Sequence, residues 1–153
     1  MIQRKQTIFL LLAFILTMIC LCLPIGHFVL EGMGVSPVMY NLWIETGDGL
    51  RDFSSWPLFL ALVLSGTISL IDIFLYKNRP LQAKLCWVII GLLAIWYLGY
   101  FLLGNSLADE FKADFQFSYI VACLPAIAII LTFLARKGIM ADEKLVRSMD
   151  RIR

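Results

Sequence analysis

Charged side chains are absent from four long apolar stretches of the chain, at residues 6–30, 53–71, 85–108 and 115–135. About 20 helical residues cross the ~30 Å hydrocarbon layer of a bilayer, and each stretch is long enough to do so. A soluble helix of this length would carry a charged face, which these stretches lack. The pattern predicts an all-α membrane protein with four transmembrane helices.

Breaker residues and the first charged side chains set the expected bounds of the helices, which are residues 7–23, 56–76, 85–103 and 119–135. Pro24 should end the first helix, and Pro57 suits the first turn of the second. The long connection contains VMYNLWIETGDGL, which fits either a short hairpin or an interfacial cap. We expect a short acidic loop between the third and fourth helices, and a single domain over residues 1–153.

Composition and charge place these helices in a membrane and orient them. Hydrophobic residues make up 61% of the chain and charged residues 16%, outside the range of soluble domains. Eleven of the 13 lysines and arginines lie before the first helix, between the second and third, or after the fourth. Because cytoplasmic loops carry the Lys/Arg excess, we expect a multi-pass protein with both termini in the cytoplasm. The net charge of +2 therefore reflects topology and does not indicate nucleic-acid binding.

One face of the second helix carries small and polar residues at helical spacing, namely Ala61, Ser65, Ser69, Asp72 and Tyr76. Small residues at four-residue spacing let helices pack closely in lipid, and hydroxyl groups bond across such contacts. We therefore expect this face to be buried against the other helices. Ser65, Ser69, Asp72 and Tyr76 form the candidate polar intramembrane site.

Asp72 is the one ionisable residue expected inside a span, and two interpretations remain open for it. Intramembrane carboxylates often mark proton or cation paths. Alternatively, Asp72 lies only about 7 Å inside the cytoplasmic boundary, given the helical rise, and anchors the helix there. The second interpretation, in which Lys77, Lys84 or Arg4 pairs with the carboxylate, is favoured by this shallow depth.

Aromatic residues cluster near the expected ends of the spans. Trp56, Tyr100 and Tyr119 fall near the outer boundary, and Tyr76 and Trp87 near the inner one. Such positions are typical of the aromatic belt on lipid-facing helix ends.

The remaining candidates for chemistry are four cysteines and one histidine. Cys20 and Cys22 point to different faces of a helix, so they form neither a CxxC redox pair nor a shared metal site. The single histidine, His27, excludes a bis-histidine haem within one chain. The sequence contains no catalytic triad and no glycine-rich phosphate loop. We therefore expect a non-enzymatic protein with no cofactor and no metal.

The C-terminal tail, residues 136–153, is charged and regular. Gly138 is expected to break the fourth helix, and a separate amphipathic cytoplasmic helix is expected to begin near Ala141. Its narrow apolar stripe consists of Leu145, Met149 and Ile152. The tail then either lies on the anionic leaflet, pairs with another helix, or acts as a solvated anchor.

Three stretches carry a family resemblance: the start MIQRKQT, the turn YKNRPLQAKLC and the end ADEKLVRSMDRIR. With the order of spans, they resemble a family of small four-span membrane proteins from Bacteroidota-type bacteria, catalogued as a domain of unknown function. The resemblance implies a location in the bacterial cytoplasmic (inner) membrane. It implies no activity, substrate or catalytic residue.

All three stretches are cytoplasmic by the charge pattern, which leads to a functional hypothesis. We expect a basic docking face for a protein partner or anionic lipid, formed by Arg4, Lys5, Lys77, Arg79, Lys84, Arg147 and Arg151. The protein would then be an interaction or accessory subunit. The alternative is a small transporter or channel subunit using Asp72, which would require a homo-oligomer because four helices with one polar stripe make a poor pore.

Overall fold

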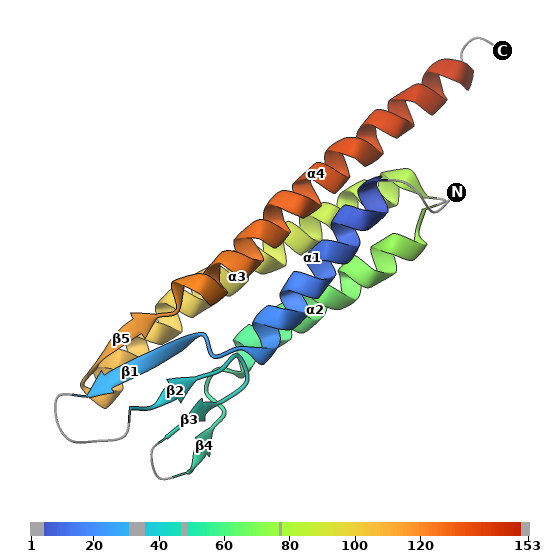
Figure 1. The fold of residues 1–153 in the computed structure, drawn as a ribbon. Coiled ribbons are helices and arrows are strands. Elements are labelled where there is room, and N and C mark those ends of the chain that lie inside the picture. The colour runs from blue at the N-terminus through green and yellow to red at the C-terminus, as the bar shows by residue number, and fades with distance from the viewer. Residues whose placement is uncertain (1–4, 31–35, 47–48, 77, 151–153) are drawn as a thin grey trace.

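The computed structural model describes residues 5–30, 36–46, 49–76 and 78–150 (Figure 1). The helices are α1 (Lys5–Cys22), α2 (Trp56–Phe74), α3 (Arg79–Phe111) and α4 (Tyr119–Asp150). The strands are β1 (Gly26–Leu30), β2 (Val38–Met39), β3 (Ile44–Glu45), β4 (Arg51–Asp52) and β5 (Ala113–Phe117). Within these residues, four helices are long and apolar enough to cross a membrane, as the hydrophobic pattern predicted.

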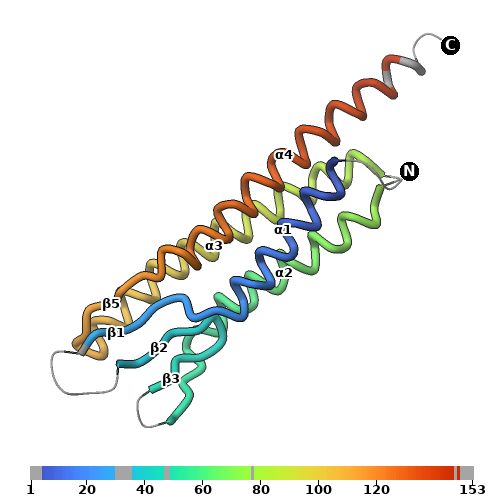
Figure 2. Tube along the Cα trace, in the orientation of Figure 1, coloured from blue at the N-terminus to red at the C-terminus, as the bar shows by residue number. Residues whose placement is uncertain are grey.

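The helices form an elongated bundle in which α1 and α3 each pack against both α2 and α4 (Figures 1 and 2). The start of α1, the junction of α2 with α3 and the end of α4 lie at one end, which we call the tail end. The strands lie at the other, which we call the sheet end. The first and last parts of the chain are therefore on the same side of the bundle.

α3 is longer at both ends than the expected span of residues 85–103. It begins at Arg79, with Pro80 in its first turn, where the missing N–H of proline costs no hydrogen bond. It ends before Lys112, whose left-handed backbone (φ 48°) reverses the chain into β5. The helix therefore continues through polar sequence beyond its apolar segment.

The expected break of α4 at Gly138 is wrong, and the tail forms no separate helix. α4 continues through Gly138 to Asp150 as one helix. A Cβ placed on Gly138 would lie 2.9 Å from Cγ of Gln6, which belongs to α1. The glycine therefore permits a close approach of two helices, and its low helix propensity is overridden by the packing around it.

A five-stranded antiparallel sheet in the order β4-β3-β2-β1-β5 covers the sheet end. A hairpin, one of the two structures expected to fit the long connection, is present. β1 and β5 were not predicted, so the all-α fold class and the acidic loop before α4 need correction. β1 pairs with β5 over five residues, from Gly26 with Phe117 to Leu30 with Ala113. Side-chain burial alternates along β5, as the two-residue repeat of a strand requires.

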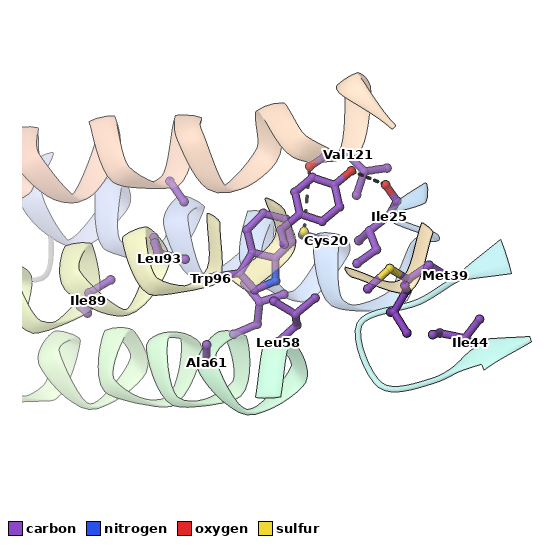
Figure 3. Close-up of a cluster of buried hydrophobic side chains, with 14 of the residues drawn as sticks. Cys20, Ile25, Met39, Ile44, Leu58, Ala61, Ile89, Leu93, Trp96 and Val121 are labelled. Atoms are coloured by element: carbon purple, nitrogen blue, oxygen red, sulfur yellow. Dashed lines mark hydrogen bonds between the residues drawn. The ribbon is translucent and has the colours of Figure 1, made fainter. Parts of the chain in front are cut away.

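The hydrophobic core has two parts. The larger cluster lies toward the sheet end and contains Trp96, Leu93, Leu58 and Phe28, with Met39 and Ile44 from the strands (Figure 3). The smaller lies toward the tail end and contains Leu10, Ala83, Cys86, Ala135 and Ile139. The strands thus contribute side chains to the same core as the helices.

Phe115 of β5 joins the sheet to α3 through two glycines. A Cβ on Gly104 of α3 would lie 2.6 Å from the Phe115 ring, and one on Gly26 of β1 would lie 2.3 Å from it. Only residues without a side chain leave room for the ring between helix and strand. Tyr100, expected on a lipid-facing boundary, is instead buried beside Phe115, and its hydroxyl donates to the carbonyl of Ile25 at 2.5 Å.

Candidate functional site

Four residues of the predicted polar stripe on α2 lie in the interior of the bundle. Ala61, Ser65, Ser69 and Asp72 are buried, and the Ser69 hydroxyl donates to the Leu10 carbonyl of α1 at 3.1 Å. This contact is the hydroxyl bond between helices that the stripe predicted. Tyr76 does not belong to the buried face, because it follows the end of α2 and is 62% exposed.

Asp72 contacts α3 through both its side chain and its backbone. The Cys86 thiol donates to Oδ2 at 3.4 Å, and the Gln82 amide donates to the Asp72 carbonyl at 3.0 Å. In the part of the chain that the structure describes, Oδ1 has no hydrogen-bond partner, although the residue is fully buried. Lys84, one expected partner, is exposed.

Arg136 of α4 completes this group, and the sequence did not single it out. Its guanidinium carbon lies 4.8 Å from the centre of the Trp87 ring, within the range of a cation–π contact. Its Nε is buried and lacks a partner among the described residues. Ala135, the preceding residue of α4, packs with Cys86 in the smaller core cluster. We call Asp72, Gln82, Cys86 and Arg136 the tail-end polar cluster; it joins α2, α3 and α4.

The first part of the tail is attached to the bundle at Asp142. The Gln6 amide of α1 donates to Asp142 Oδ2 at 3.0 Å, and Arg79 of α3 donates to the Asp142 carbonyl at 3.0 Å. Arg79 therefore forms a hydrogen bond within the fold, which was not expected of a residue assigned to the docking face. Beyond this point α4 projects past the other three helices (Figure 2).

The expected docking-face residues are only partly placed by the structure. Lys5 and Lys84 are exposed at the tail end, and Arg79 is half-buried there. The other members fall on positions whose side chains the structure does not describe, namely Arg4, Lys77, Arg147 and Arg151. On the projecting part of α4, Leu145 is 63% exposed and Lys144 is exposed beside it.

A second polar group lies at the sheet end, and two prolines cause it. Pro24 has no N–H to bond the carbonyl four residues earlier, so the Cys20 carbonyl is left without a helical partner. Asn41, from the turn between β2 and β3, donates to this carbonyl at 2.8 Å. Trp96 Nε1 in turn donates to Asn41 Oδ1 at 2.9 Å, so both ends of the buried amide are bonded.

Pro125 has the same effect on α4. It frees the Val121 carbonyl, toward which the Cys20 thiol points at 3.9 Å (Figure 3). The Tyr97 hydroxyl donates to the next carbonyl, that of Ala122. The position of each proline in the sequence indicates that the carbonyl four residues earlier needs another donor. Which residue supplies that donor can be seen only in the fold.

Among the described residues, the cysteines and the histidine do not gather into a site. Cys20 and Cys86 are buried, whereas Cys22 and Cys123 are exposed, and His27 is exposed on β1. Over the described ranges, no group of three or more His, Cys, Asp or Glu residues is arranged to hold a metal ion.

Comparison with known proteins gives a family for nearly the whole chain. A family described as a domain of unknown function (DUF4293) matches residues 2–152, which confirms that the chain belongs to a family catalogued as a domain of unknown function. No curated protein matches the chain. The match carries no activity with it, so function has to be argued from the structure.

Proposed function

Because this chain belongs to the DUF4293 family, whose description names no activity, we propose a function from its geometry. We propose that it is a four-span protein of the bacterial cytoplasmic (inner) membrane. Its role is that of a non-enzymatic interaction or accessory subunit, whose tail end docks a partner protein in the cytoplasm. The projecting part of α4 is the main contact element.

The exposed surface of the helices supports membrane insertion. Large apolar side chains are exposed on all four helices, including Ile8, Leu64, Leu98 and Ile130. A soluble monomer rarely exposes apolar surface so extensively, whereas lipid tails solvate it without cost. The helix lengths also suit the hydrocarbon layer.

The distribution of charge supports a cytoplasmic tail end. Lys5 lies at the start of α1, Arg79 and Lys84 lie in the first two turns of α3, and the last part of α4 carries Arg136, Lys137 and Lys144. These parts of the helices lie at the tail end of the fold. The sheet end instead carries acidic side chains such as Glu45, Asp109 and Asp114. The Lys/Arg excess favours the cytoplasmic side.

The observation that carries the docking proposal is the continuation of α4 past Asp142, where it projects beyond the other three helices (Figure 2). Asp142 is bonded to Gln6 and Arg79, but the helix continues to Asp150. A helix that leaves its bundle loses the packing that stabilises most helices in water. An exposed Leu145 among charged residues gives it a surface suited to a second helix or groove.

Site-specific photocrosslinking in intact cells tests this function. A photoreactive residue at Leu145 should give one dominant protein adduct, and so should one at Lys84. The control is Leu50, which is exposed at the sheet end and should not give the same adduct. Equal adducts from Leu145 and Leu50, or no adduct from Leu145, would reject docking at the tail end.

Asp72 gives specific support to a second function, a small oligomeric transporter or channel subunit. Its Oδ1 is buried and unpartnered within the described structure, as a site for a transient proton or cation would be. Flux through the protein in liposomes, compared between wild type and Asp72→Asn, decides this. Flux that the variant abolishes while it remains folded would favour transport over docking.

A further inference from the structure

Exposed Lys84 and Trp87 of α3 and half-buried Arg136 of α4 form a basic and aromatic group near the tail end. Trp87 is 52% exposed, and Arg136 lies over its ring at 4.8 Å. Lys84 is exposed and lies three residues before Trp87, so both project from the same face of α3. Two positive charges therefore flank one indole ring.

Arg136 is held so that it can bind an anion. A guanidinium stacked on an aromatic ring keeps the N–H groups in its plane for hydrogen bonding. Those groups match the spacing of phosphate oxygens. The stacking also fixes the side chain, which lowers the entropy that binding would otherwise lose.

An apolar notch continues from this group along the same face of α3. Gly91 follows Trp87 by four residues, and nothing lies within 4 Å of a Cβ placed on it. Exposed Val88 and Ile95 border this open space. The charged group and the notch lie along one surface, which we call the α3–α4 face.

We propose that the α3–α4 face binds one anionic phospholipid. The phosphate lies between Lys84 and Arg136, the glycerol region lies against Trp87, and an acyl chain lies over Gly91. This assignment rests on the membrane insertion proposed above but not on the docking of a protein partner. The basic residues complement the headgroup charge, and tryptophan suits the headgroup level. A free phosphate would leave the notch unused, so the α3–α4 face favours the lipid.

Native mass spectrometry of the purified full chain in detergent tests the lipid site. The probes are phosphatidylglycerol and phosphatidylcholine with identical acyl chains. Lys84→Gln should weaken phosphatidylglycerol binding about fivefold, since each basic residue near anionic lipid contributes about that factor. Arg136→Gln should have a similar or larger effect. Phosphatidylcholine binding should change less than phosphatidylglycerol binding in both variants.

Lys137→Gln is the matched control, because it removes an adjacent exposed charge that is not part of the α3–α4 face. It should change binding by no more than about twofold, the usual range for surface substitutions. If Lys137→Gln weakens binding as much as Lys84→Gln does, general charge attraction explains the data and the site is rejected. Equal affinity of wild type for the two lipids also rejects it. Lys84 is exposed, so its variant keeps the test valid if Arg136→Gln fails to fold.

Gly91→Leu tests the notch separately from the charge. The leucine should fill the open space and weaken the binding of both lipids, and added inorganic phosphate should not displace phosphatidylglycerol. Unchanged binding in Gly91→Leu, or ready displacement by phosphate, would overturn the assignment of an acyl chain. Lipid binding in detergent needs no partner protein, so failure of this site and failure of tail-end docking are distinguishable.

Discussion

The side chain of Asn41 donates a 2.8 Å hydrogen bond to the backbone carbonyl of Cys20, in place of the N–H that Pro24 lacks. The amide comes from the turn between β2 and β3, so this bond attaches the sheet to the end of α1. Its oxygen accepts from Trp96 of α3. One buried side chain thus connects three parts of the fold.

Asn41→Ala should destabilise the protein by about 2–5 kcal/mol, because it leaves two buried polar groups, the Cys20 carbonyl and the Trp96 N–H, without partners. Thermal unfolding in detergent measures the loss. Asn105→Ala, which removes an exposed amide from α3, is the control and should have little effect. A similar loss in both variants would contradict the role given to Asn41.

Gly104→Ala should destabilise the protein by about 1–3 kcal/mol, since a new methyl group would overlap the Phe115 ring. Gly91→Ala is the matched control in the same helix. It meets open space and should be neutral or stabilising by up to about 1 kcal/mol, because alanine has the higher helix propensity. Unfolding midpoints in the same detergent compare the two. Equal effects would mean that the Phe115 contact is not tight.

Cys86→Ala should lower the free energy of unfolding by about 1–3 kcal/mol, because it removes the side-chain donor to the buried Asp72 carboxylate. Cys86→Ser retains a donor and should recover part of this loss. Cys123→Ala removes an exposed thiol and serves as the control. Chemical unfolding gives the ranking, and a serine variant less stable than the alanine variant would argue against the hydrogen bond.

Arg79→Gln combined with Gln6→Ala should loosen the attachment of α4 at Asp142. Hydrogen exchange should become faster for amides of residues 139–146, because helix that lacks tertiary packing opens more readily. Amides near Ala128, in the middle of the bundle, should be unchanged. Faster exchange along the whole of α4 would instead indicate global destabilisation.

The spans were predictable because lipid leaves a strong signal: long uncharged segments correspond to all four helices. The buried face of α2 was also predictable from the spacing of Ser65, Ser69 and Asp72. The ends of the helices were less predictable, because α3 and α4 extend into polar sequence. There, tertiary contacts decide where the helix ends. Gly138 is an example, because its contact with Gln6 is invisible without the fold.

The sheet was only partly predictable because its pairing is long-range. The segment ADFQF is short and follows an acidic stretch. Its charge therefore favoured a loop, although its alternating pattern is typical of a strand. Its partner β1 is more than 80 residues earlier in the chain, and no local signal links the two. For the same reason, only one member of the tail-end polar cluster was predicted. Asp72 was identified, but Cys86, Gln82 and Arg136 come from other helices.

The central claim, a four-span protein whose tail end faces the cytoplasm, is tested most directly by reporter topology. Alkaline phosphatase, which is active only outside the cytoplasm, is joined after Arg153 or inserted at Gly49, in the exposed turn of the sheet end. The fusion after Arg153 should be inactive and the insertion at Gly49 active, at equal protein levels. Activity after Arg153 with none at Gly49 would contradict the orientation and the docking surface that depends on it.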